Sequence, residues 1–448
     1  MLLLSFTVRN HKSIRDEVSL DLLKPTLRTL RPQAGESWRQ HVFPIAGIFG
    51  SNATGKSTVL DALYYAFAAI SASSTKWLAR KVMPRAPFRL DDVSEASPSR
   101  YELDFVHDDR RYVYGFEVDD KGIAREWLRD VPSTRWRTLL ERDRERGLVK
   151  THPSIGALGR VSDRELVLSR ARVVGHGLLG PVADDLVSSF EWTSVKDADR
   201  ARRLAGLADA LFEESVAPDD IVALLKVADI GIESIGVKEK GIPQELREAL
   251  VGLFRAQLVS SADTVQENDG DAEAPERENL SEQASVAVAR SLTFSHRSSR
   301  DDPPAFYIQD ESDGTIAWLA LAVPALAVLR RGGFYCLDEI DSSLHPHLVD
   351  LLLGAFADPG VNVRGAQLIF TSHETFVLSP LSEVELEPEQ VWFTDKSREG
   401  ATELFCLDDF PRHRGANVAK RYLEGRYGGT PRLAPGILSG LIADGVNV

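Results

Sequence analysis

Two glycines, a lysine and a serine near the start of the chain have the spacing of a phosphate-binding loop. Residues 50–57 read GSNATGKS, which fits the pattern G-x-x-x-x-G-K-[ST]. The two glycines let the backbone curl so that successive N–H groups point inward, toward a bound polyphosphate. We expect Lys56 to reach the β- and γ-phosphates, and the Ser57 hydroxyl to complete a Mg²⁺ shell. The predicted ligand is a nucleoside triphosphate, and its predicted binding residues are Gly50, Ser51, Asn52, Ala53, Thr54, Gly55, Lys56, Ser57 and Thr58.

The segments on either side of this loop provide the context that the motif requires. Residues 42–49 are a short apolar run suited to a buried strand, and residues 59–67 continue as an apolar helix. A strand, a loop and a helix in this order distinguish a phosphate-binding loop from an ordinary glycine-rich turn.

A pair of acidic residues far along the chain fits the other half of such a site. Residues 334–337 form an apolar, strand-like run, and Asp338 and Glu339 follow it directly. In phosphate-loop ATPases such a strand lies beside the strand of the loop, its first acid holds Mg²⁺, and a following glutamate acts on the attacking water. We therefore predict Asp338 and Ser57 as metal residues and Glu339 as a catalytic residue.

The composition is that of a soluble globular protein with two or three subdomains. The chain has 448 residues, 43% hydrophobic and 27% charged. Cys336 and Cys406 lie in strand-like runs and form no C-x-x-C pair, which indicates buried thiols in a reducing cytoplasm. The start of the chain lacks the charged region of a signal peptide, and the longest apolar stretch, 316–329, is interrupted by Pro324 and shorter than the roughly 18 residues of a membrane helix. We expect a cytoplasmic protein without membrane contact.

The net charge of −14 is unevenly distributed along the chain. Residues 263–282 have a local balance of −7, because eight acids face Arg277 alone, and this segment is predicted to be a solvated, disordered loop. Residues 125–150 are rich in arginine, and such a run can contact the phosphates of DNA. Five acids are interleaved with these arginines, so an exposed face of mixed charge is an equally good interpretation.

The apolar pattern predicts an α/β fold with an antiparallel side sheet and a mainly helical insert. Strands of alternating pattern near the N-terminus predict a hairpin and then a meander beside the nucleotide-binding half. The expected strands are 2–8, 18–22, 87–90, 101–106, 112–118, 230–237, 334–337, 367–370 and 391–393, and the expected helices are 199–212, 243–258, one after Thr315 and one after Leu344.

Three further motifs resemble those of a known family. Residues 311–315 (ESDGT) precede a long apolar helix, residues 338–346 (DEIDSSLHP) follow the acidic strand, and residues 370–374 (FTSHE) end the next strand. This ordered set resembles the signature, Walker B, D-loop and switch-histidine motifs of ABC-type ATPases, in the branch that contains RecF, SMC and OLD proteins. The strongest resemblance is to stand-alone bacterial AAA ATPases of the RloA and PtuA kind, and it covers residues 1–127 and 287–431.

The resemblance implies further site residues. Ser312 and Gly314 open a helix and would form an anion site for the γ-phosphate of an ATP molecule held by the other subunit. His373 would donate a hydrogen bond to the same phosphate, and Asp341 would lie at the subunit seam. Lys12 resembles a nucleotide contact of the family, although the interpretation that we prefer is a lone surface lysine. The chain departs from the family at Asp313 of the signature, and it has no clear Q-loop glutamine.

We therefore expect an ABC-type ATPase head that binds ATP and Mg²⁺ and acts as a homodimer or higher homo-oligomer. Its predicted parts are residues 1–130, a first half with the phosphate-binding loop and side sheet; 131–286, an insert; 287–430, a second half; and 431–448, a tail. Long coiled-coil arms are excluded because the interval between the two halves must also hold strands. The resemblance implies phage defence or DNA surveillance with a separately encoded nuclease or toxin as effector. The alternatives are a RecF-like repair clamp and a nucleotide-controlled scaffold that sequesters a toxin without DNA. A P-loop kinase is a weaker alternative, because it would not need the motifs at 311–315 and His373.

Overall fold

We describe a computed structural model of the chain, which covers residues 1–194, 217–228, 232–237, 292–298, 310–342, 344–411 and 417–430, together with 300, 304, 306 and 307. The helices expected at 199–212 and 243–258, the acidic loop at 263–282 and the tail from 431 lie outside these residues.

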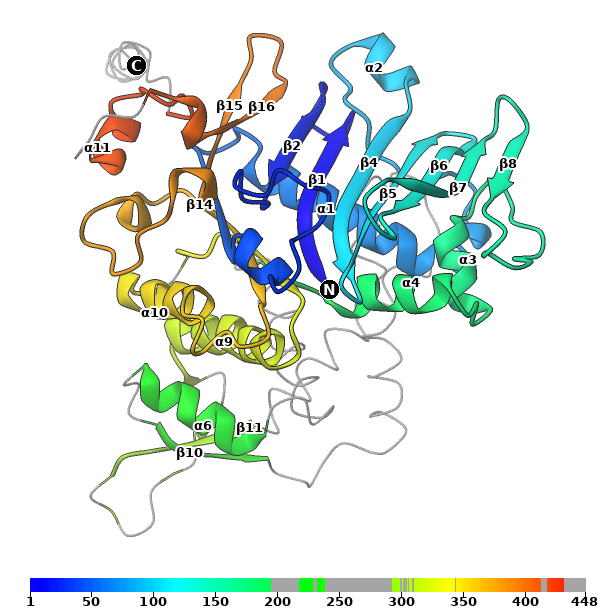
Figure 1. The fold of residues 1–448 in the computed structure, drawn as a ribbon. Coiled ribbons are helices and arrows are strands. Elements are labelled where there is room, and N and C mark those ends of the chain that lie inside the picture. The colour runs from blue at the N-terminus through cyan, green and yellow to red at the C-terminus, as the bar shows by residue number, and fades with distance from the viewer. Residues whose placement is uncertain are drawn as a thin grey trace, which may run out of the picture.

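The first sheet has seven strands, and every neighbouring pair is antiparallel. The predicted hairpin and meander are confirmed, but residues 87–90 are not a strand. The sheet continues past residue 130, the predicted end of the first half (Figure 1). The strands follow the order β2 (Val18–Asp21), β1 (Leu2–Arg9), β4 (Ser99–His107), β5 (Arg110–Asp119), β6 (Gly122–Asp130), β7 (Arg137–Asp143) and β8 (Leu148–Thr151).

The second sheet, called the central sheet below, has six strands and is parallel except at one edge. Its order is β16 (Thr402–Cys406), β15 (Val391–Lys396), β3 (Ile45–Phe49), β14 (Gln367–Ser372), β13 (Phe334–Asp338) and β9 (Phe190–Ser194). The expectation that the acidic strand lies beside the strand of the loop is wrong, because β14 lies between β3 and β13. Since all three strands are parallel, their carboxyl ends still share one edge, and groups that follow them can meet there.

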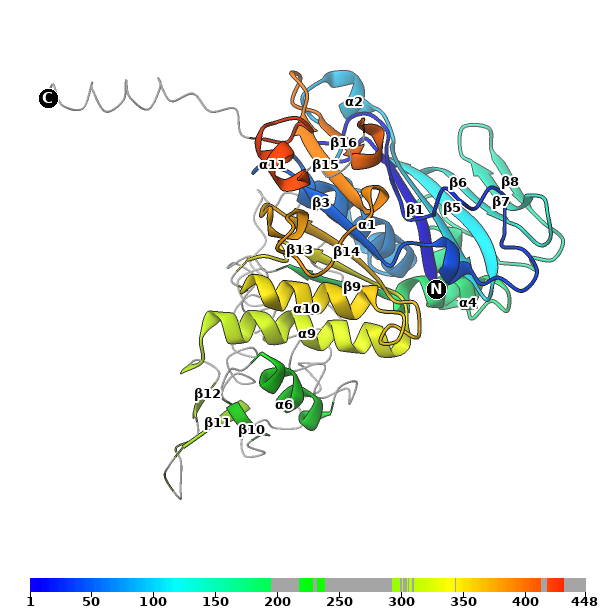
Figure 2. The same cartoon turned by 60° about the vertical axis from the view of Figure 1, so that its left-hand side comes forward.

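The helix after the loop, α1 (Lys56–Ala72), lies between the two sheets (Figures 1 and 2). It is buried almost all round, as its run of apolar residues predicts. One core joins it to the seven-stranded sheet and to one face of the central sheet, through Ala46, Ile48, Cys336 and Ile369. Two short helices, α3 (Val167–Val173) and α4 (Leu179–Ser188), pack against its later turns.

The opposite face of the central sheet is covered by α9 (Asp313–Arg331) and α10 (Pro346–Ala357) (Figure 2). Alternate strand residues, including Ile45, Phe49 and Leu337, form a second core with these helices. Pro324 lies inside α9 and does not interrupt it. By length and composition α9 is apolar enough to cross a membrane, but most of that apolar stretch is buried in the protein, as in the core helix of a soluble protein.

A helix and a small antiparallel sheet lie beside α9: α6 (Pro218–Val227) and the strands β10 (Ile232–Val237), β11 (Leu292–His296) and β12 (Phe306–Tyr307). Of these, α6 and β10 come from the predicted insert, whereas β11 and β12 lie in the predicted second half, and α6 packs directly against α9. The indole of Trp318 donates a hydrogen bond to the Leu224 carbonyl, and Arg330 forms two bonds with Asp220. The strand expected at 230–237 is confirmed by β10. The division of the chain into domains stays a prediction. Within the predicted insert, β7 and β8 belong to the seven-stranded sheet and β9 belongs to the six-stranded sheet. Two further short helices, α2 (Asp92–Ala96) and α11 (Val418–Leu423), lie near the phosphate-binding end.

A buried histidine attaches the turn after β1 to α1. His11 Nδ1 lies 2.7 Å from the Tyr101 hydroxyl, and its Nε2 lies 2.7 Å from Oδ2 of Asp61. Lys12 Nζ lies 2.8 Å from the other carboxylate oxygen of Asp61. Burial raises the pKa of Asp61, but the hydrogen bonds and charges of His11 and Lys12 outweigh it and bring this pKa down to about 2. The Asp61 carboxylate on α1 therefore attaches the turn after β1, and with it the first strand of the antiparallel sheet, to this helix.

We predict that Asp61→Asn lowers the free energy of unfolding and makes it less dependent on pH in the acid range. The pKa of Asp61 falls from 3.8 to about 2 on folding, so its stabilisation is present above pH 4 to 5 and is lost as the pH falls toward 2. The carboxylate is about one third exposed, so we expect a loss of about 1 to 2 kcal/mol in the free energy of unfolding at pH 7, below the full linkage value. Urea unfolding followed by tryptophan fluorescence between pH 3 and pH 7 measures it.

The matched control is Asp16→Asn, which removes an exposed carboxylate paired with Arg15. We expect that change to cost less than about 0.5 kcal/mol. An Asp61→Asn protein with the same acid dependence as the unmodified protein would contradict the linkage.

Candidate active site

The phosphate-binding loop connects the carboxyl end of β3 to α1. Lys56 is buried, and its Nζ donates hydrogen bonds to the carbonyls of Gly50 (2.7 Å) and Ser51 (3.0 Å). Asn52 and Ala53 are exposed at the tip of the loop. The ammonium group of Lys56 thus lies within the loop, where the sequence predicts phosphate.

Glycine is required at two positions of the loop for different reasons. Gly55 has φ +110°, which favours glycine, and a side chain there would collide with Thr402. Residue 50 must lack a side chain, because a Cβ at that position would collide with the Thr394 and Thr54 hydroxyls. The loop is therefore shaped by β15 and β16 as well as by its own residues.

Residues from both ends of the chain hold the loop in place. Thr394 and Thr54 share a 2.7 Å hydrogen bond between their hydroxyls, and Thr402 donates to the Thr54 carbonyl at 2.9 Å. The Ser51 N–H donates to the Gly429 carbonyl at 2.6 Å. The hydroxyl of Ser13, in the turn after β1, lies 2.8 Å from that of Thr402. The sequence does not predict these contacts of Thr394, Thr402 and Gly429, because nothing near them in the chain marks a phosphate site.

The two predicted metal residues meet at the carboxyl edge of the central sheet. The Ser57 hydroxyl, in the first turn of α1, donates a 2.8 Å hydrogen bond to Oδ1 of Asp338, at the end of β13. A hydroxyl and a buried carboxylate at the mouth of the loop are the oxygen ligands that Mg²⁺ takes beside nucleotide phosphates, so this donor pair fits the ion. A Mg²⁺ ion held by Ser57 and Asp338 would neutralise charge on the phosphates.

Thr371, at the end of β14, positions both acids of the predicted pair. Its hydroxyl donates to Oδ1 of Asp338 at 2.7 Å and accepts the N–H of Glu339 at 2.8 Å. Glu339 has φ +62°, a left-handed conformation that is uncommon for a residue with a side chain and that clusters at functional sites. The sequence motifs alone assign no role to Thr371. Its position two residues before His373 is the signal that points to it.

The signature residues lie on the other face of the central sheet from α1. Ser312 is the N-cap of α9, and its hydroxyl oxygen accepts the N–H of Thr315 at 3.1 Å. Ser312 and Asp313 are exposed, and Gly314 is half-buried beside them. The described contacts of Ser312 are therefore those of a helix cap.

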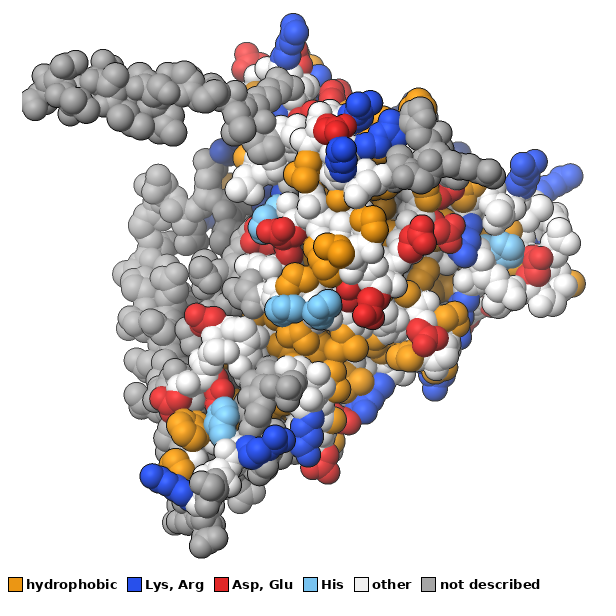
Figure 3. Space-filling view, turned by 90° about the vertical axis from the view of Figure 1, so that its left-hand side faces the viewer, with side chains coloured by type: hydrophobic (Ala, Val, Ile, Leu, Met, Phe, Trp, Pro, Cys, Tyr) orange, Lys and Arg blue, Asp and Glu red, His pale blue; other side chains and the backbone are white. Residues whose placement is uncertain are grey.

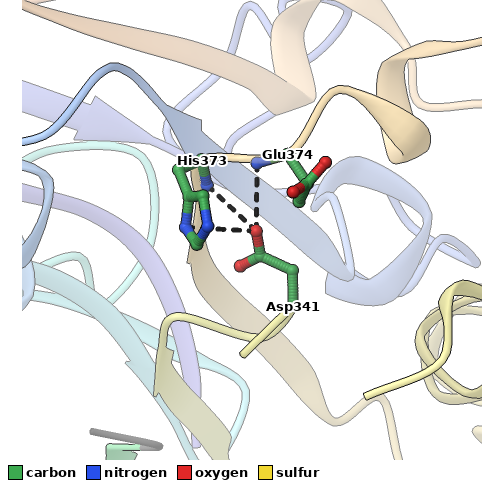
Figure 4. Close-up of side chains that lie close together, drawn as sticks. All are labelled: Asp341, His373 and Glu374. Carbon is green, nitrogen blue, oxygen red and sulfur yellow. Dashed lines mark hydrogen bonds and ion pairs between the residues drawn. The ribbon is translucent and has the colours of Figure 1, made fainter. Parts of the chain in front are cut away.

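His373 and Asp341 lie side by side at the end of β14 (Figure 4). Oδ2 of Asp341 lies 3.3 Å from Nδ1 of His373, and it also accepts the N–H groups of His373 (3.3 Å) and Glu374 (3.0 Å). The His373 side chain is about half exposed, so its free edge faces solvent. His345 caps the start of α10.

Most of the arginines suggested as phosphate contacts are paired with acids. Arg142 is buried, lies 3.6 Å from Glu126 and donates to two backbone carbonyls. Arg137 lies 2.6 Å from Asp130, and Arg144 pairs with Asp119. These contacts favour the interpretation of a mixed-charge face.

A comparison with protein families identifies the chain. The family described as "AAA domain, putative AbiEii toxin, Type IV TA system" matches residues 45–379, which is more than half of the sequence. The chain belongs to this AAA family. It has a P-loop ATPase fold, with the loop, the acidic strand and the intervening strand at one sheet edge. No curated protein matches the chain significantly.

Solved structures with a similar fold include SMC head domains. The SMC head domain from Thermotoga maritima has 12% identity and a TM-score of 0.39, over 91% of this chain and 99% of that one. An SMC head bound to the C-terminal winged-helix domain of ScpA has 13% identity and a TM-score of 0.40, over 91% and 97%. An SMC head from Pyrococcus furiosus has 14% identity and a TM-score of 0.38, over 95% and 99%.

We predict that Thr371→Val lowers the free energy of unfolding, because it removes the hydroxyl that bonds to Asp338 and Glu339. Valine has a similar shape, but it leaves Asp338 without one donor and the Glu339 N–H without its acceptor. A buried unsatisfied group costs about 1 to 3 kcal/mol, and we expect that loss in the free energy of unfolding. Urea unfolding measures it, and Thr371→Ser, which keeps the hydroxyl, is the control. Equal unfolding midpoints for the valine and serine variants would count against the role of the hydroxyl.

Proposed function

We propose that this protein is an ABC-type ATPase that binds MgATP, dimerises around it and hydrolyses it slowly. The observation that carries the proposal is the hydrogen bond between Ser57 and Asp338, because it joins the phosphate-binding loop to an acidic strand 281 residues away. Family membership supports the ATPase assignment.

The roles of the residues in this site follow from their chemistry. The backbone N–H groups of residues 50–58 and the Lys56 ammonium bind the phosphates. Ser57 and Asp338 hold the Mg²⁺ ion, either directly or through water. Glu339 acts on the attacking water as a base or orienting group, and Thr371 fixes the backbone from which Glu339 projects.

The second half of the proposed site is supplied by another subunit. Ser312 and Gly314 begin a helix whose N-terminus is exposed and favours an anion. They lie on the opposite face of the central sheet from α1, which supports their use by the nucleotide of a partner. His373 donates to the same γ-phosphate. Figure 3 shows the side of the molecule on which hydrophobic side chains lie among acidic ones and histidines, a mixed composition like that of transient interfaces.

The biological setting that we propose is phage defence or DNA surveillance in the cytoplasm, with a separately encoded nuclease or toxin as effector. Its support is the resemblance of the sequence motifs and the family description, which names a toxin–antitoxin system. Arginines of β7 are paired with acids of β6, which argues against DNA contact by these arginines. Identifying the neighbouring genes tests this setting, because a repair clamp needs no nuclease or toxin beside it.

We predict that Glu339→Gln removes hydrolysis and keeps ATP binding. The amide has the same shape but cannot act as a base, so turnover should fall at least about 100-fold. Lys56→Ala should instead weaken ATP binding at least about tenfold, because it removes a charge-assisted hydrogen bond. Phosphate release and a nucleotide-binding titration measure the two effects.

Glu383→Gln makes the same chemical change at an exposed position away from the site, and its turnover should match that of the unmodified protein. A Glu339→Gln protein that releases phosphate at the normal rate would exclude the role given to this glutamate.

We predict that trapped ATP increases the dimer fraction. The γ-phosphate contributes binding energy across the seam that ADP cannot supply, so Glu339→Gln with ATP should be more dimeric than with ADP. Adding Ser312→Arg should abolish that gain by placing a bulky side chain in the seam, whereas Ser312→Thr keeps the cap and should retain the gain. Mass photometry at several dilutions measures the fractions. A single oligomeric state with either nucleotide at every dilution, together with normal hydrolysis by Ser312→Arg, would refute the shared site.

A further inference from the structure

Three side chains at the carboxyl edge of the central sheet bring a nitrogen and carboxylate oxygens together, apart from the Ser57 and Asp338 pair. Asp341 follows β13, and His373 and Glu374 follow β14. One possible ligand atom from each residue lies within 4.8 Å of the others. Figure 4 shows the His373 ring on one side of the Asp341 carboxylate and the Glu374 carboxylate on the other.

Asp341 is a buried carboxylate with incomplete hydrogen bonding. Its side chain is only 8% exposed, and Oδ2 is held by the backbone N–H groups of His373 and Glu374. Its Oδ1 is buried and has no hydrogen-bond partner among the residues that the structure describes. The negative charge is shared by both oxygens of the carboxylate. Leaving Oδ1 buried without a donor is costly, and a cation bound at Oδ2 would offset part of that cost.

The spacing of Asp341 and His373 suits a shared metal ion. Oδ2 and Nδ1 are 3.3 Å apart, whereas a charge-assisted hydrogen bond between such groups is about 2.7 to 2.9 Å long. Two ligands placed about 2.0 to 2.1 Å from one tetrahedral zinc ion are about 3.3 Å apart. Since His373 is about half exposed and Glu374 is exposed, an ion can enter from solvent.

We propose that Asp341, His373 and Glu374 bind a divalent transition metal ion of the zinc type. One imidazole and two carboxylates form a nitrogen and oxygen ligand set that suits Zn²⁺, whereas Mg²⁺ prefers six oxygen ligands. Water fills the remaining position. The site itself does not depend on the proposed function. Its consequence does rest on it, because an ion bound to His373 competes with the γ-phosphate of ATP for that ring.

The test is a calorimetric titration of Zn²⁺ into the full-length protein, freed of metal with a chelator and without nucleotide. We expect one ion per chain to bind with an affinity that His373→Ala and Glu374→Gln each weaken at least about tenfold. Glu374→Gln is nearly isosteric at an exposed position, so a folding defect does not explain its effect. Titration with Co²⁺ should produce a visible absorption band that is lost in the same two variants, and millimolar Mg²⁺ should not displace it.

His347→Ala is the matched control, because His345 and His347 form an exposed pair at the start of α10 with ring centroids 5.1 Å apart. Loss of the bound ion in this variant, unchanged affinity in both His373→Ala and Glu374→Gln, or the absence of saturable Zn²⁺ binding would each overturn the proposal. These outcomes are separable from failure of the ATPase proposal, because the titration contains neither nucleotide nor a measurement of turnover.

Discussion

The burial of α1 between two sheets is the constraint on which the rest of the structure depends. A helix that is apolar almost all round has no face for solvent, so it must be covered on both sides. The central sheet covers one side, and the antiparallel sheet built from β1 and the meander covers the other. Because the phosphate-binding loop is the start of this helix, the position of the loop is fixed by the core. The carboxylate of Asp61, held by His11 and Lys12, adds a polar attachment at the same helix.

The loop is completed by residues that come from distant parts of the chain. Thr394 and Thr402 fill the space that the absent side chains of Gly50 and Gly55 leave, and the Gly429 carbonyl takes one N–H of the loop. Packing of Phe393 against Tyr422 and Tyr427 holds this last segment in place. The C-terminal strands therefore hold the loop in place, and a substitution in them is expected to alter the predicted phosphate site through these contacts.

The edge of the central sheet concentrates hydrogen-bonded acids in a small volume. Asp338 is satisfied by hydroxyls of Ser57 and Thr371, whereas Asp341 retains one buried oxygen without a partner among the described residues. The strand β14 contributes to both arrangements, through Thr371 on one side and His373 on the other. The Asp338 and Asp341 carboxylates are thus linked through β14, because Thr371 bonds to one and His373 contacts the other. Asp338 and Thr371 belong to the buried parallel strands β13 and β14, and Asp341 and His373 follow the ends of these strands.

The sequence by itself determined the features that depend on local pattern. The loop of residues 50–57, the buried strands, the hairpin and meander, and the helices after Thr315 and Leu344 follow from periodicity and motif spacing, which neighbouring residues encode. The tertiary structure alone decided which strands are neighbours, because pairing depends on packing across the whole chain. That is why β14 was not expected between β3 and β13, and why Thr371, Thr394, Thr402 and Gly429 were missed. Their roles come from hydrogen bonds to residues up to several hundred positions away, and no local pattern records such contacts.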